Sequence, residues 1–164
     1  KLAEKSNDNL LARVEILKQT GRPPKLVAIL VGGDPASATY VSMKKKTCEK
    51  LGIKTEIKRL SADTTTDQLE NIISELNADQ EVDGILLQHP VPSRIDEQKC
   101  FNTIDISKDV DGVTTQGFGN MAMGLRAFGS CTPLGVMRLL KEYSVKIEGK
   151  NALVIGRSQI LGKP

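Results

Sequence analysis

A tyrosine and a lysine lie four residues apart in "VGGDPASATYVSMKKKTCEKLGI", residues 31 to 53. The pattern predicts a helix, in which Tyr40 and Lys44 share one face. Lys45 and Lys46 are turned away from that face by roughly 100° and 200°. Lysines in a run are usually solvated surface charges, but Lys44 shares its face with Tyr40 and Cys48 rather than with other charges. We therefore take Lys44 as a candidate for proton transfer, with a solvated surface charge as the alternative.

Two further segments carry polar groups that could reach the same site. In "LLQHPVP", Gln88 ends an apolar run and needs hydrogen-bond partners, which a neighbouring lysine or the free groups at the strand end could supply. His89 is either a catalyst of third rank or an ordinary loop residue. In "KDVDG", Asp109 and Asp111 precede a glycine, which indicates a turn first. A carboxylate there could also accept hydrogen bonds from the amine groups of a ligand.

The segment "VIGRSQILGKP" has the form of a strand, a glycine-bearing turn and the start of a helix. Such a turn can direct backbone N–H groups at a phosphate, and Arg157 could add a charged fork. However, Gly156 and Gly162 are six residues apart, and Ser158 occupies the second glycine position of the dinucleotide fingerprint. Nucleotide binding and an ordinary tight turn both remain open on spacing alone.

Alternating strand and helix patterns predict an α/β fold with a parallel sheet and right-handed crossovers. Ligands gather beyond the carboxyl ends of such strands, which here are "VGGDP" and "QHPVP". The expected elements are a helix ended by Gly21, a strand over 25–31, a helix from Asp34 to about Leu51, a strand over 53–60, a helix over 64–77 and a strand over 82–88.

The rest of the chain reads as a connection and the opening of a second unit. Residues 93 to 111 are polar with one short helix, and the four glycines of 116–129 predict a bend or linker. Thr132 and Pro133 then open a helix, and 151–156 reads as a strand. In that helix we expect Val136, Leu139 and Leu140 to be buried. Because one strand cannot make a stable sheet, we expect a nearly complete domain over 1–130 and the truncated start of another over 131–164.

Composition argues against several classes of protein. The net charge is only +3, the two signs are mixed, and aromatic residues are scarce, so we expect no nucleic-acid partner. No apolar run approaches the ~18 residues of a membrane span. The three cysteines have no metal-ligand spacing and there is one histidine, so we expect no metal site. Unpaired cysteines fit a cytoplasmic protein, or one of an organelle matrix.

The segments "GGDPASATYVSMKKK", "GILLQHPVP", "KDVDG", "CTPLGVMRLL" and "GRSQILGKP" together resemble the methylenetetrahydrofolate dehydrogenase/cyclohydrolase family. The resemblance covers essentially the whole chain, with the motifs in the family's order. It implies a folate-binding catalytic domain followed by the start of a Rossmann-like domain that binds NADP. It also implies that a complete subunit forms a homodimer.

The resemblance assigns roles to individual residues. Lys44 is implied to be the catalytic lysine of the Y-x-x-x-K motif, with Tyr40 stacking on the folate and Gln88 hydrogen-bonding to Lys44. Asp111 would accept hydrogen bonds from the pterin ring. The implied residues of the folate pocket also include Leu87 and His89, and those of the NADP site are Gly156, Arg157 and Ser158. His89 departs from the family, in which leucine is expected.

The implied activity is NADP-dependent oxidation of 5,10-methylenetetrahydrofolate, followed by hydrolysis of the methenyl product to 10-formyltetrahydrofolate. We expect Lys44 to act in the hydrolysis as a partly neutral amine, because the bound methenyl group is itself cationic. The alternatives are a dehydrogenase without the hydrolysis, a lysine-dependent amino-acid dehydrogenase, and an inactive ligand-binding fragment.

Overall fold

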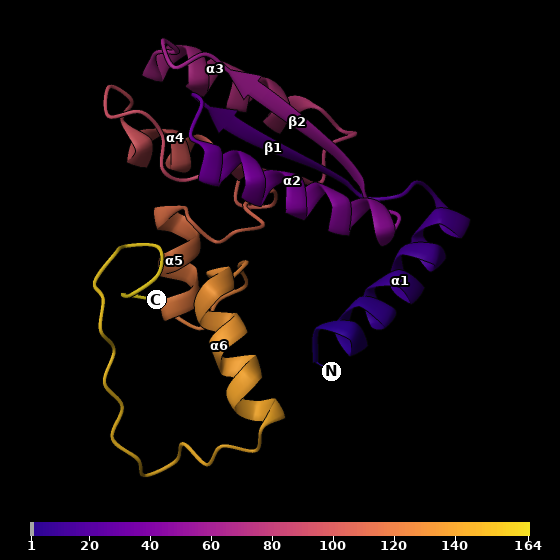
Figure 1. The fold of residues 1–164 in the computed structure, drawn as a ribbon, viewed down its shortest axis with the longest axis vertical. Coiled ribbons are helices and arrows are strands. Elements are labelled where there is room, and N and C mark those ends of the chain that lie inside the picture. Colours follow the sequence, from indigo (N-terminus) through magenta and orange to yellow (C-terminus); the bar gives the residue numbers. More distant parts are fainter. Residues whose placement is uncertain (1) are drawn as a thin grey trace.

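The computed structural model describes residues 2–164 and contains a three-stranded parallel sheet in the order β2-β1-β3 (Figure 1). The register places Ala28 of the central strand opposite Ile57 on one side and Leu86 on the other. The strands are β1 (Lys25–Val31), β2 (Lys54–Leu60) and β3 (Gly84–Leu87). The predicted β-α-β-α-β order and the parallel sheet are confirmed.

The first crossover helix, α2 (Pro35–Lys50), begins and ends as the sequence predicts. The carboxylate of Asp34 accepts the backbone N–H of Ser37 at 2.7 Å, and proline occupies the first helical position. Gly52, with a φ of 75°, follows the helix in a conformation that glycine adopts without strain. These boundaries fix the helical phase of Lys44 relative to the sheet.

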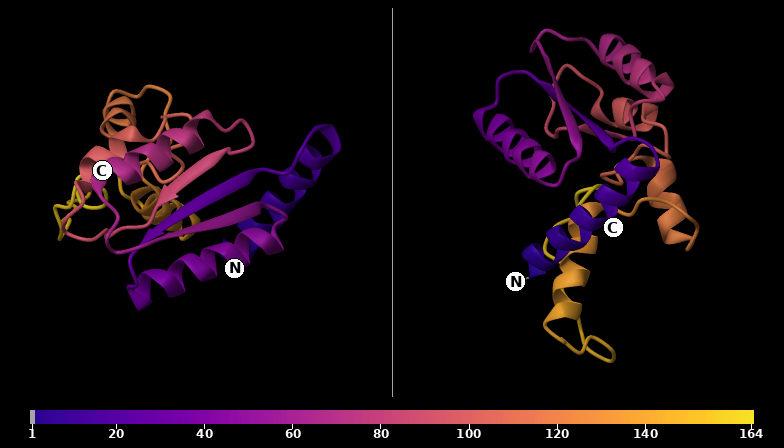
Figure 2. Two further views of the ribbon diagram at one scale, coloured as in Figure 1. Left: turned by 90° about the horizontal axis from the view of Figure 1, so that it is seen from above. Right: turned by 90° about the vertical axis from the view of Figure 1, so that its right-hand side faces the viewer.

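Helices cover both faces of the sheet (Figure 2). On one face, α3 (Thr66–Ala78) and α4 (Glu97–Thr103) pack against the strands, and the fully buried Phe101 and Ile73 contribute to a shared apolar cluster. On the other face, Val41 of α2 packs with alternate strand residues such as Ala28. Burial on both faces explains why β1 and β3 are continuously apolar.

A buried carboxylate organises the chain after the sheet. Asp109 is 1% exposed, and its two oxygens accept three backbone N–H groups, those of Gly112, Val113 and Thr114, at 2.9–3.0 Å. Gly112 has a φ of 68°, and a Cβ there would lie 2.5 Å from the carbonyl carbon of Gly129. This turn therefore sets the close approach of two segments that are far apart in sequence.

The predicted linker over 116–129 is wrong in part, because it contains a helix. The helix α5 (Thr115–Ala122) begins at Thr114, whose hydroxyl accepts the N–H of Gly117 at 2.9 Å. Its glycines lower the helix propensity, but a side-chain cap and packing against α4 outweigh that cost. The glycines of this segment predicted a bend or linker, and the N-cap at Thr114 was not predicted from the sequence.

Two predictions for the C-terminal region are also wrong. The helix α6 (Cys131–Glu142) forms, but Val136 and Leu139 are 50% and 48% exposed and Leu140 is only half-buried. Residues 151–156 form no strand, and Ile155 is 93% exposed. A strand exists through pairing, and none of the described residues pairs with this segment. The domain boundary at residue 130 stays a prediction.

The N-terminal helix α1 (Leu2–Thr20) is as predicted, although Val14 is the one residue of α1 that is buried among those the structure describes. None of the helices over residues 2–164 is long and apolar enough to cross a membrane.

The two aspartates of the turn provide a matched test of its energetics. We expect Asp109→Asn to lower the free energy of unfolding by about 2 kcal/mol, because an amide NH₂ would replace one acceptor that faces backbone N–H groups. Asp111→Asn should change it by no more than about 0.5 kcal/mol, since that half-exposed side chain supports no such set of bonds. Urea unfolding of both variants is the measurement, and equal losses would contradict the role given to Asp109.

Candidate functional site

Lys44 lies beside Tyr40, as the helical spacing predicts. Its Nζ atom is 4.6 Å from the centroid of the tyrosine ring, a cation–π contact worth about 0.5–1 kcal/mol at a partly exposed position. Lys44 is half-buried, and within residues 2–164 it forms no ion pair. Its neighbour Lys45 instead pairs with Glu49 at 3.6 Å. Lys44 thus differs from an ordinary paired surface lysine and keeps its ammonium available.

The structure separates the two aspartates of "KDVDG". Asp109 is committed to backbone N–H groups and cannot bind a ligand. Asp111 is half-buried, and its backbone carbonyl accepts the N–H of Cys131 at 3.2 Å. Of the two, only Asp111 therefore retains a carboxylate that is free to accept hydrogen bonds from a ligand.

Cys131 is a member of this site that sequence reasoning missed. Its thiol donates to the carbonyl of Val110 at 3.3 Å. Burial of the thiol raises the pKa of Cys131 to about 11; the charge of Asp111 and a hydrogen bond with it act in the same direction, and Lys44 opposes them. Lys44 and Asp111 therefore both lie within electrostatic range of this thiol. In the sequence, a single cysteine before a predicted helix gave no indication that Cys131 belongs to this site.

Gln88 does not make the predicted bond to Lys44. Its backbone N–H continues the ladder to Ile29 at 2.9 Å, and its Nε2 donates to the carbonyl of His89 at 2.7 Å. Its Oε1 is buried and has no hydrogen-bond partner among the described residues. Since Lys44 lies over Tyr40 instead, this carbonyl oxygen is left as an unused acceptor, which costs about 1–3 kcal/mol.

The other two residues predicted for the folate pocket differ from each other. Leu87 is buried and packs in the apolar cluster under α3, and its place in the folate pocket stays a prediction. His89 is half exposed, and its Nδ1 lies 2.7 Å from Oε1 of Glu97, the first residue of α4. The carboxyl end of β3 thus presents Gln88 and His89 outward and keeps Leu87 in the core.

The residues predicted to bind NADP are not assembled with the lysine. Gly156, Arg157 and Ser158 are exposed, and the strand that should precede them is absent. The carbonyl of Ser158 accepts the N–H groups of Gly162 and Lys163 at 3.1 and 3.0 Å, which closes a tight turn. Within residues 2–164 no hydrogen bond or ion pair joins this turn to Lys44, Gln88 or Asp111.

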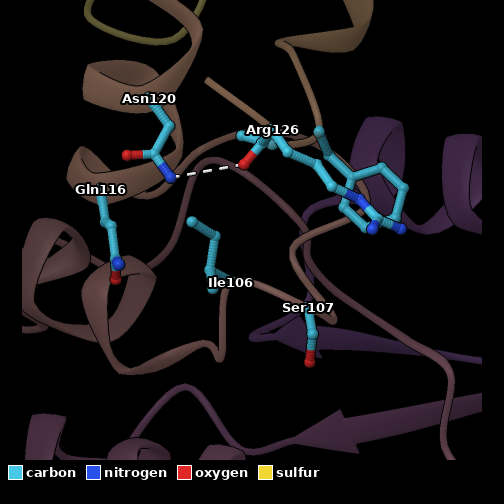
Figure 3. Close-up of a pocket in the computed structure, with 7 residues that line it drawn as sticks. Ile106, Ser107, Gln116, Asn120 and Arg126 are labelled. Carbon is cyan, nitrogen blue, oxygen red and sulfur yellow. Dashed lines mark hydrogen bonds between the residues drawn. The ribbon is translucent and has the colours of Figure 1, made fainter. Parts of the chain in front are cut away.

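A separate pocket of about 420 Å³ lies between α5 and the loop that follows it (Figure 3). The side chains of Gln116 and Asn120 lie on one side of it and Arg126 on the other, and Asn120 donates to the Arg126 carbonyl at 3.4 Å. None of the predicted catalytic residues lines this pocket. Nor do residues 2–164 contain a group of three or more His, Cys, Asp or Glu side chains able to hold a metal ion.

Two family models match the chain. Residues 1–111 match the catalytic domain of tetrahydrofolate dehydrogenase/cyclohydrolase, and residues 130–164 match the NAD(P)-binding domain of the same enzymes. The first match alone covers more than half of the chain.

Curated relatives give the same result. The chain is 58% identical to the bifunctional protein FolD of Teredinibacter turnerae and 57% identical to that of Acinetobacter baumannii, over 99% of its own length. It spans 59% and 58% of the lengths of these two relatives.

Solved structures share the fold. The FolD dehydrogenase/cyclohydrolase of Campylobacter jejuni superposes with a TM-score of 0.95 at 43% identity, covering 98% of this chain and 57% of that one. The Trypanosoma brucei enzyme, solved with NADP cofactor and inhibitor, superposes with a TM-score of 0.93 at 30% identity, covering 98% and 56%. Taken with the match over residues 1–111, these likenesses show that the chain belongs to the tetrahydrofolate dehydrogenase/cyclohydrolase family.

Proposed function

We propose that this chain supplies the folate side of an enzyme that oxidises 5,10-methylenetetrahydrofolate with NADP and hydrolyses the methenyl product to 10-formyltetrahydrofolate. The observation that carries the proposal is the half-buried Lys44, which forms no ion pair within residues 2–164 and whose Nζ atom lies over the Tyr40 ring on α2. Family membership and the similarity to the Campylobacter jejuni dehydrogenase/cyclohydrolase support the same reaction pair.

The oxidation needs positioning rather than a base. Hydride leaves the one-carbon bridge directly for the nicotinamide, so this chain has only to hold the folate in reaction geometry. Asp111 would do so by accepting hydrogen bonds from the amine-bearing edge of the pterin, and Tyr40, which is 53% exposed, offers a ring for stacking. NADP is the preferred cofactor in this proposal because the Arg157 guanidinium suits an additional phosphate.

The hydrolysis needs proton transfer, which we assign to Lys44. Two unit charges at about 5 Å in an effective dielectric near 20 repel by roughly 3 kcal/mol, so a cationic methenyl group would favour the neutral amine. The unused Oε1 of Gln88 is an acceptor without negative charge, and it could orient the amine without restoring the ammonium. A carboxylate at the same position would oppose the neutral state.

Two further parts of the proposal have separate grounds. From the resemblance we propose that the complete subunit assembles as a homodimer, which sedimentation of the complete protein would test. From the unpaired cysteines we propose that it acts in the cytoplasm.

Our second proposal concerns the 164-residue chain by itself. Because its Gly156 turn is exposed and follows no strand, we infer that the chain alone neither holds NADP firmly nor turns over.

The first test replaces Lys44 in a protein that joins this chain to a complete NAD(P)-binding domain. Lys44→Met should lower the rate of methenyl hydrolysis by about 10²- to 10⁴-fold, the usual contribution of a proton-transfer group. Lys45→Met is the matched control, since that ammonium pairs with Glu49 on another face. Both steps are followed by the absorbance of the methenyl product, and near-normal hydrolysis in the Lys44 variant would end the proposal.

The second test concerns Asp111. Loss of a charge-assisted hydrogen bond costs about 1.5–3 kcal/mol, so Asp111→Asn should weaken folate binding by roughly 10- to 100-fold. NADP binding should change far less, because the carboxylate is assigned to the pterin. Titration calorimetry with each ligand separates the two effects, and equal losses for both would refute the pterin role.

The third test uses the 164-residue chain alone. Fluorescence titration with NADPH should show no binding at micromolar concentrations, because no nucleotide loop is assembled around Gly156. The complete protein serves as the positive control. Tight binding by the isolated chain would contradict the second proposal.

A further inference from the structure

The turn that carries Gln88 is held by a single carboxylate. One oxygen of Glu97, Oε1, lies 2.7 Å from Nδ1 of His89 and also accepts the backbone N–H of Val91 at 3.2 Å. Glu97 opens α4, whose Phe101 is in the core, and the N–H of the capping Asp96 donates to Thr66 at 2.9 Å. The packing of α4 therefore fixes the position of Glu97, and Glu97 in turn holds the His89 side chain and the Val91 backbone.

The contacts of His89 and Val91 with Glu97 affect which end of the Gln88 carboxamide is free to bind another group. The Nε2 group of Gln88 donates to the backbone carbonyl of His89 at 2.7 Å, and the opposite end, Oε1, is buried without a partner. An ammonium or amine presents N–H donors, so it can bind the oxygen end of a carboxamide and not the NH₂ end of a flipped one. The position of the His89 carbonyl therefore determines whether the Gln88 oxygen is available to accept a hydrogen bond from an amine.

We propose that His89 and Glu97 are positioning residues, a proton-sensitive pair that fixes the His89 carbonyl and so holds the Gln88 oxygen toward an amine donor in the site. The identification of that donor as Lys44 rests on the proposed function; the pair itself does not. A leucine at position 89, as the family resemblance leads one to expect, cannot bind Glu97.

The protonation state of the imidazole controls the strength of the tie. An imidazolium donates from Nδ1 with a full charge facing the Glu97 carboxylate, whereas a neutral ring carries one proton that either nitrogen can hold. Glu97 is the charged group within ion-pair distance of the ring. The other charges on the first turn of α4 are Asp96 and Lys99, and Lys99 is paired with Glu70 at 2.6 Å. Loss of the imidazolium charge therefore weakens the contact between His89 and Glu97.

Nuclear magnetic resonance of the labelled 164-residue chain tests the pair without any activity assay. His89 is the one histidine in the sequence, so a single imidazole signal reports its titration. We expect the chemical shifts of the Gln88 side-chain NH₂ group to change with pH with the same midpoint as those of the imidazole. The reason is that the His89 carbonyl, which accepts from that NH₂ group, moves. In Glu97→Gln the imidazole should still titrate while the pH-dependent shift of Gln88 is lost.

Two variants separate positioning from a merely structural effect. Asparagine places a donor nitrogen the same number of bonds from Cα as Nδ1 and does not titrate, so His89→Asn should hold the Gln88 signals at their low-pH position throughout. The control Glu75→Gln, at an exposed position of α3, should behave as the parent chain does. Gln88 signals that ignore pH in the parent chain, or that follow it equally in Glu97→Gln, would overturn the proposal. Lys44→Met leaves this readout intact, so a failure of the proposed catalysis and a failure of the pair are distinguishable.

Discussion

The arrangement of the candidate site depends on one buried carboxylate. Asp109 exchanges its hydration for three backbone N–H groups, and the stretch that carries it pairs with β3, where the N–H of Ile85 donates to the carbonyl of Lys108 at 2.9 Å. The turn is therefore held both to the sheet and to itself. Because Asp111 follows two residues later, the turn that Asp109 holds also sets the position of Asp111, the carboxylate that we propose binds the pterin.

The same turn brings the start of α6 to the sheet. The hydroxyl of Ser130 donates to the carbonyl of Gly112 at 2.8 Å, and Cys131 contacts the backbone of Val110 and Asp111. The site is thus assembled from three places in the chain: α2, the end of β3, and the junction between Asp109 and Cys131. The match to the NAD(P)-binding domain begins at residue 130, so this junction also lies where the two family models meet.

Local signals in the sequence were sufficient to predict the parallel sheet and the face of α2 on which Tyr40 and Lys44 lie. Asp34, Pro35 and Gly52 mark the helix ends chemically, and the spacing of Tyr40 and Lys44 then fixes their contact. Contacts between distant segments were not predictable in this way. Nothing in "KDVDG" says that Asp109 is the buried partner of backbone N–H groups, or that Cys131 lies near Lys44. The bond from Gln88 to Lys44 is absent because the ammonium lies over the Tyr40 ring, although Oε1 of Gln88 has no other partner among the described residues.

The thiol of Cys131 has a consequence for the durability of the site. With a pKa of about 11, roughly one thiol in ten thousand is ionised at pH 7, and the thiolate is the form that peroxides and electrophiles attack. Cys131 is exposed, so solvent reaches it. Desolvation of the thiol and the charge of Asp111 outweigh the effect of Lys44 on its pKa, so less of the reactive thiolate is present than for an ordinary cysteine.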